Sequence, residues 1–247
     1  MKRVIVALVF TLLPLTGQAA VKRTLQTTTP AADVTHASIN VGVGQLKVTT
    51  SSDDKIHVQV QLEQKSQNFL WFFHWMSNST VKEIEQVTLQ QQQNQNDIAY
   101  SLKYPEHLDE GDIKQDWEVQ VPAALAIKIE MGVGQLDLTG VAGGVDASLN
   151  VGEVTLNTPR GPLQVKVNVG QINATSASTQ PGNIKLSTSI GDARVYMPGG
   201  SDHDDVHHNG LGRTIEVAGK GPDKMDLEVN IGEVTLHIEP AKSDDKK

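Results

Sequence analysis

The chain has 247 residues, a formal net charge of −8 and no cysteine. The acidic charge argues against nucleic acid as a partner and against electrostatic attraction to anionic lipid, so any membrane contact would depend on apolar side chains. The lack of cysteine excludes both a disulfide-stapled domain and a lipoprotein anchored through a cysteine.

Residues 1–19 have the pattern of a cleaved export signal. Lys2 and Arg3 precede an apolar stretch at residues 4–15, and Gly17 and Ala19 place small residues where signal peptidase requires them. The apolar stretch is shorter than the roughly 20 residues that a membrane span needs. We therefore expect cleavage after Ala19 and a mature protein that is periplasmic or secreted.

A short phrase with a central glycine occurs seven times, and its last six glycines recur every 18 to 21 residues. A fixed period of this length, combined with strand-type alternation, is typical of a β-solenoid in which each repeat is one coil. We predict an all-β, single-domain β-solenoid over residues 20–240, followed by a charged tail at 241–247. The marked glycines, which we expect at tight arcs, are Gly44, Gly134, Gly152, Gly170, Gly191, Gly212 and Gly232.

The fourth copy shows how each repeat would form a coil. Leu163, Val165, Val167 and Val169 alternate with polar residues, which predicts a strand with these four side chains buried. Gly170 then breaks the phase, because the next apolar residue is two positions further on. Each coil should therefore hold two strands, joined by a tight arc at the glycine and closed by a looser turn.

The residue after each marked glycine should form a column along the stack, with neighbours about 4.8 Å apart. No two acids are adjacent in this column, because Gln171 separates the first pair and Arg213 the second. The sixth repeat, around Gly212, is irregular, and we expect either a bulge that keeps Val206 in the core or a poorly ordered coil. In chain order the column reads Gln135, Glu153, Gln171, Asp192, Arg213 and Glu233.

An insert at about residues 50–122 separates the first phrase from the second. Its pattern predicts antiparallel strands at residues 56–62, 86–91, 98–103 and 117–121, with a hairpin turn at 94–97.

The insert also contains the run FLWFFHWM at residues 69–76. This run would either cap an open end of the solenoid or form an exposed patch for a partner protein or a bilayer. Bulky apolar residues on every face cannot all be buried against one surface. The run therefore supplies the candidate interaction residues Phe69, Trp71, Phe72, Phe73 and Trp75.

The segment WEVQVPAALAIKIEMGVGQLDLTGVAGGVDASLNVGEVTLNTPRG resembles the bacterial family named "putative adhesin", whose members are envelope proteins of undetermined function with a repetitive "toastrack" β-solenoid. The resemblance spans residues 33–238, although the aromatic run departs from it. It implies a solenoid fold and an envelope location, and it carries over no catalytic residue. The positions that match the family pattern are Val119, Pro122, Gly132, Gly134, Gly152, Gly170, Gly191 and Gly232.

Enzymatic and metal-binding alternatives depend on weaker patterns. A solenoid hydrolase or lyase acting on envelope glycan could use Arg160, Arg194 and Arg213. Zinc or copper could be bound by residues of one extended segment, although without fixed geometry the spacing predicts no tight metal site. The candidate ligands in that segment are Asp202, His203, Asp205, His207 and His208.

We therefore expect an exported, non-enzymatic, adhesin-like scaffold or binding module of the cell envelope that needs no cofactor. Its expected partners are an envelope protein or a second copy of the chain, with a glycan or a membrane surface as alternatives. The runner-up function is the glycan hydrolase or lyase.

Overall fold

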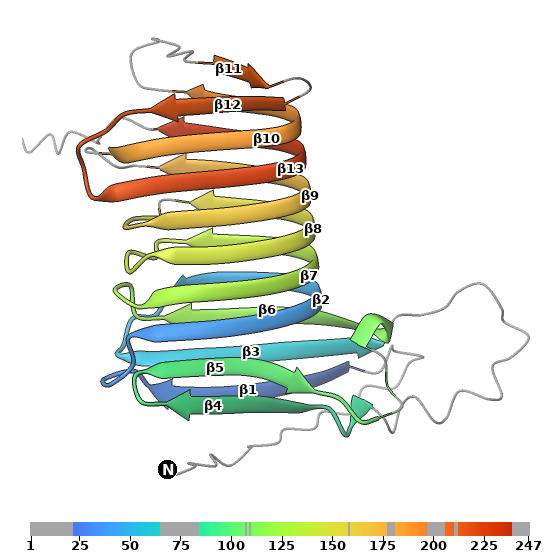
Figure 1. Ribbon diagram of the computed structural model, residues 1–247. Helices are drawn as coiled ribbons and strands as arrows, with labels where there is room; N and C mark the ends of the chain where they lie inside the picture. The colour runs from blue at the N-terminus through green and yellow to red at the C-terminus, as the bar shows by residue number, and fades with distance from the viewer. Residues whose placement is uncertain are drawn as a thin grey trace, which may run out of the picture.

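The computed structural model describes residues 22–64, 84–106, 108, 110–157, 159–176, 181–196, 206–209 and 212–238. Thirteen strands join in one sheet, with a short 3₁₀ helix, η2 (Glu110–Asp112), before β6 (Figure 1). Within the described residues, no helix is long and apolar enough to cross a membrane. The strands are β1 (Lys22–Pro30), β2 (His36–Thr50), β3 (Lys55–Gln64), β4 (Thr88–Asn94), β5 (Asp97–Lys103), β6 (Ile113–Val121), β7 (Ala126–Thr139), β8 (Val145–Asn157), β9 (Leu163–Ser176), β10 (Pro181–Tyr196), β11 (Val206–Asn209), β12 (Gly212–Val217) and β13 (Asp223–Ile238).

Six long strands form the solenoid: β2, β7, β8, β9, β13 and β10. Each strand bends at its marked glycine, so its two arms lie in two layers with the core between them (Figure 1). Parallel pairing continues on both sides of the bend, as in Leu149 with Val167 and Val154 with Ile172. The predicted all-β solenoid is confirmed, although each coil is one continuous bent strand where we expected two.

The coils do not stack in chain order. The order is β2-β7-β8-β9-β13-β10, so the last strand fills the place between β9 and β10. The cause is the sixth phrase, which forms no coil: Gly212 begins β12, and β12 pairs antiparallel with the first arm of β10. The prediction of an arc at Gly212 is therefore wrong, and β11 and β12 form a hairpin that extends only one layer.

The alternation of buried and exposed residues in each first arm also ends two residues earlier than predicted. Val165 and Val167 are buried, but Val169 is 43% exposed. The phase slip occurs before the glycine, not after it, because the backbone turns outward as it enters the bend. The same exposure recurs in the neighbouring coils.

The insert forms the antiparallel end of the sheet. Strands β3, β5 and β6 confirm three of the predicted segments, and β4 begins at Thr88, two residues later than expected. β4 and β5 form the predicted hairpin around Gln95, whose φ is 53°. The first arm of β2 pairs with β5 and the second with β6, so the coil beneath β2 is built from two separate strands.

Several sequence predictions lie outside the described residues. These are the export signal, the aromatic run 69–76, the charged tail, and the ligand candidates Asp202, His203 and Asp205. For His207 and His208 the structure describes only the backbone of β11.

Candidate functional site: the glycine edge

The bends of the six coils lie along one side of the molecule, which we call the glycine edge. It consists of the bend glycines and the residues directly before and after them. The bend glycines have φ between 136° and 153°, a region that L side chains rarely adopt. In stacking order they are Gly44, Gly134, Gly152, Gly170, Gly232 and Gly191.

A second constraint requires glycine at the bends. A Cβ atom added to Gly170 would overlap the carbonyl oxygen of Gly152, and the same holds for Gly232 over Gly170 and Gly191 over Gly232. Each bend is therefore packed directly against the backbone of the next coil. No larger residue fits without displacing a carbonyl group of the sheet.

The residues directly before the glycines form an exposed aliphatic row. Their exposed fractions lie between 43% and 48%, whereas the arms of the same strands bury their aliphatic residues almost completely. Isolated exposed aliphatic residues are common, but a continuous row across neighbouring coils is a candidate interaction surface. The exposed members are Val133, Val151, Val169, Ile231 and Ile190, and the half-buried Val43 extends the row.

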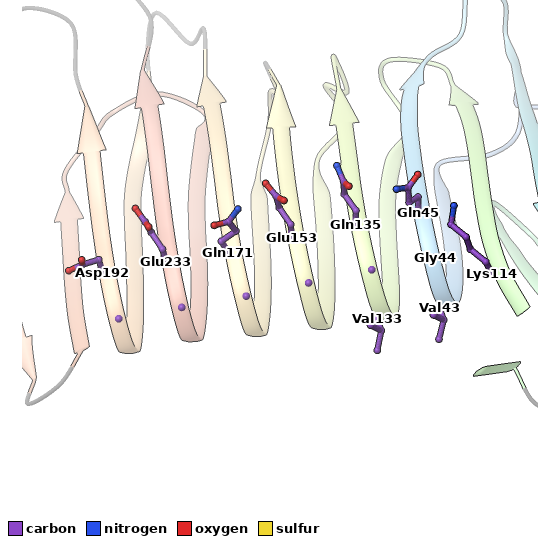
Figure 2. A pocket seen from close by; sticks show the side chains of 15 residues that line it. Val43, Gly44, Gln45, Lys114, Val133, Gln135, Glu153, Gln171, Asp192 and Glu233 are labelled. Carbon is purple, nitrogen blue, oxygen red and sulfur yellow. The ribbon is translucent and has the colours of Figure 1, made fainter. Parts of the chain in front are cut away.

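The residues directly after the glycines form a polar row (Figure 2). In stacking order it reads Gln45, Gln135, Glu153, Gln171, Glu233 and Asp192. The prediction that no two acids are adjacent is therefore wrong, because β13 brings Glu233 next to Asp192. Arg194 bridges these two carboxylates and compensates their repulsion.

Between the two rows lies a shallow groove with a volume of about 980 Å³. The glycine backbones form part of its lining, together with members of both rows and Lys114 at the β6 end. In Figure 2, Val43 and Val133 project on one side of the glycines and the polar row projects on the other. The polar row therefore lines the groove along its whole length, whereas the aliphatic row contributes only Val43 and Val133 to the lining.

Most charges near the groove are paired within the molecule. Lys114 lies 3.1 Å from Asp116, and Arg194 and Arg213 approach Asp192 at 2.9 and 3.6 Å. Glu153 is different, because it accepts a hydrogen bond from the neutral amide of Asn173, at 3.2 Å. The centre of the polar row is therefore acidic, and both ends are compensated.

Two polar clusters hold the edge in place. On the first arms, the amide of Asn168 accepts a hydrogen bond from Asn230 and donates one to Asn150, each at 3.0 Å. At the β6 end, the fully buried Gln115 accepts a bond from Trp117 Nε1 at 3.0 Å and donates one to the Tyr104 hydroxyl at 2.7 Å. Fully satisfied polar groups of this kind fix local geometry.

Glu110, an exposed residue of η2, lies beside this cluster, with its Oε1 3.5 Å from Gln115 Nε2. Burial of the hydroxyl, with the charge of Glu110 as the second cause, raises the pKa of Tyr104 above its usual range. Tyr104 therefore stays protonated and can accept the hydrogen bond from Gln115 without a second negative charge beside Glu110.

The structure brings together two of the three candidate arginines. Arg194 and Arg213 meet at Asp192, but Arg160 lies in the connection between β8 and β9, at the edge opposite the bends. The three do not form one site. Among the described residues, no group of three or more His, Asp or Glu side chains is placed to hold a metal ion.

The exposed aliphatic row was not predicted from the sequence. The sequence nevertheless contains the pattern that defines this row, because Val or Ile precedes each of the six bend glycines. We interpreted these residues as the last buried position of each strand, since strict alternation places them on the inner face.

Of the comparisons with known proteins, the search of solved structures found similar chains. No family model matches the chain, and no curated protein matches it. A crystal structure from Clostridium sporogenes, named a "putative cell adhesion protein", covers 88% of this chain and 100% of its own, with a TM-score of 0.56 at 13% identity. This solved protein and the present chain share the β fold.

Two further solved structures, each named a "putative adhesin", also match. The Bacteroides fragilis structure covers 87% of this chain and 97% of its own at 10% identity, with a TM-score of 0.31. The Parabacteroides distasonis structure covers 88% and 97% at 10% identity, with a TM-score of 0.26.

Proposed function

We propose that the chain is an exported, non-enzymatic, adhesin-like binding module of the cell envelope and that it binds through the glycine edge. The observation that carries this proposal is the exposed aliphatic row and the partly exposed polar row, which present the same side-chain types coil after coil beside a groove. A surface of this kind suits a partner that is itself extended along the stack. The names of the solved neighbours support an adhesin-like role.

The arrangement of charges favours binding over catalysis. General acid–base catalysis needs a side chain that is free to exchange a proton with a substrate. Here the guanidinium of Arg194 is held between two carboxylates, and Arg213 lies next to one of them. These contacts are those of a structural ion network.

The hydrolase or lyase remains the alternative, since Arg194, Arg213, Asp192 and Glu233 lie together at one end of the groove. Purified protein incubated with peptidoglycan or an acidic polysaccharide tests it. Turnover that is abolished by Arg194→Ala would replace the binding proposal with an enzymatic one.

The binding proposal is tested by cosedimentation of the mature chain, at low concentration, with isolated cell-envelope fragments. The variant Val151→Ser/Val169→Ser removes two half-exposed aliphatic side chains, each of which contributes about 0.7 kcal/mol when covered. We expect an affinity loss of about tenfold.

Tyr196→Ser is the matched control. It removes a side chain that is 45% exposed, five residues beyond the bend of β10. The proposal requires the control to bind like the native chain. Equal binding by the double valine variant would contradict it.

A further inference from the structure

We infer that the partner that fits the glycine edge is a second copy of this chain, bound antiparallel about a two-fold axis. The inference rests on the proposed function in one respect, namely that the glycine edge is the binding surface. It adds the identity of the partner and the register of the contact.

The order of the polar row carries the inference. The row contains three amides and three acids, and reversing its order places each acid opposite an amide. An amide N–H donating to a carboxylate forms a charge-assisted hydrogen bond, which is stronger than a neutral one. The reversed pairs are Gln45 with Asp192, Gln135 with Glu233, and Glu153 with Gln171, each formed twice in the dimer.

The two ends of the row extend this complementarity. Asp116 on β6 is the register partner of Gln45, one step beyond the row. At the other end, the Arg213 guanidinium lies beside Asp192. Reversal brings Asp116 of one copy, which is paired with Lys114, opposite Arg213 of the other, which is paired with Asp192, so each terminal contact adds an acid–cation pair across the interface.

A two-fold axis that lies in the interface and crosses the stack between β8 and β9 produces this arrangement. Such an axis reverses the stacking order and keeps the aliphatic row facing the aliphatic row. It places Val151 opposite Val169, and the outer members face one another as valine with isoleucine. The spacing of the coils is identical in both copies because both are the same sheet, at about 4.8 Å per strand.

The alternative registers are electrostatically worse. A shift of one coil in one direction places Glu153 opposite its own copy, and a shift in the other direction places Glu153 opposite Glu233. A parallel arrangement, about an axis along the stack, would place the polar row of each copy opposite the aliphatic row of the other, which leaves its amides and carboxylates without polar partners. Like charges in contact across an interface suppress the wrong geometry, so one register is selected.

The test is sedimentation equilibrium of the full mature chain and its variants over a range of concentrations. Asp116→Arg and Arg213→Asp each create like-charge contacts at both ends of the dimer, and each should raise the dissociation constant by about tenfold or more. An equimolar mixture of the two variants forms the matched pairs again, and it should dimerise with close to native affinity. Gln171→Lys, which faces Glu153 twice per dimer, should strengthen the native association.

The mixture distinguishes a contact between two copies from a loss of fold. Asp116 and Arg213 lie at opposite ends of one stack, so they cannot compensate each other within a single copy. Asp33→Arg, in the exposed turn between β1 and β2, is the control for charge reversal and should associate like the native chain. A monomeric native chain, or a mixture no better than the single variants, would overturn the inference. If envelope binding still depends on the valine row in that case, only the identity of the partner is wrong. If that dependence is also lacking, the proposed function is wrong as well.

Discussion

The bend of β9 gives the sharpest stability prediction. Gly170→Ala places a Cβ where the carbonyl oxygen of Gly152 now lies, on a backbone with φ of 144°. The backbone strain costs about 1–3 kcal/mol. Relieving the overlap requires the neighbouring carbonyl to move, and each ladder hydrogen bond weakened in this way costs a further 1 kcal/mol or so. We expect a total loss of about 3–5 kcal/mol in the free energy of unfolding.

Gly140→Ala is the control, because Gly140 also has a positive φ but a Cβ added there would not overlap a neighbouring carbonyl group. Its φ is 78°, and an added Cβ would lie 3.4 Å from Thr50 Cγ2, which is ordinary contact. Strain alone predicts a loss of about 1–2 kcal/mol. Urea unfolding followed by far-ultraviolet circular dichroism measures both variants. If Gly170→Ala is no more destabilising than Gly140→Ala, the close packing of successive bends does not exist in solution.

Three further predictions concern charge, protonation and the aromatic run. Arg194→Met removes the guanidinium that bridges Asp192 and Glu233, so Glu233 loses its ion pair while Asp192 keeps Arg213, and the free energy of unfolding should fall by about 0.5–1 kcal/mol because these groups are partly exposed. Added salt should recover part of the loss, and a variant more stable than the native chain would contradict this account. Burial raises the pKa of Tyr100 to about 12, so the folded state keeps its proton longer than the unfolded state, and stability should fall from pH 10 to about 12. Tyr100→Phe, which removes the hydrogen bond to Thr29, should reduce that slope in urea titrations, and an unchanged slope would refute the assignment. Trp71→Ser/Trp75→Ser should weaken envelope binding or self-association with an unchanged melting temperature, whereas unfolding of this variant would make the run part of the core.

Much of the fold could be predicted from local sequence alone. The regular spacing of the glycines predicts where each coil bends, because the bend requires a residue that tolerates positive φ. Alternation in segments such as residues 163–167 identified the core, because the arms bury one face. The turn at 94–97 identified the hairpin of β4 and β5.

The stacking order could not be predicted in this way. Every coil has the same apolar pattern, so parallel pairing is equally favourable for β9 with β13 and for β9 with β10. The order is decided by the segment that begins at Gly212. This segment forms the antiparallel strand β12 and not a parallel coil, and β13 takes the position between β9 and β10. β1 was also missed, since its core contacts are made by few residues, among them Leu25 and Thr29.

The candidate site required the structure for a related reason. The residues after the glycines were predicted to form a column, but their true neighbours depend on the stacking order. The exposure of Val151 and Val169 depends on a local outward turn of the backbone before the bend. Neither feature is encoded in residue periodicity.

Side-chain footprinting with hydroxyl radicals tests the central claim most directly. The mature chain is labelled at low concentration with and without envelope fragments, and modification is measured by mass spectrometry. The account predicts that Val133, Val151, Val169 and Ile231 become protected while Tyr196 stays reactive. Unchanged modification of the four aliphatic residues, with envelope material bound, would show that binding does not use the glycine edge.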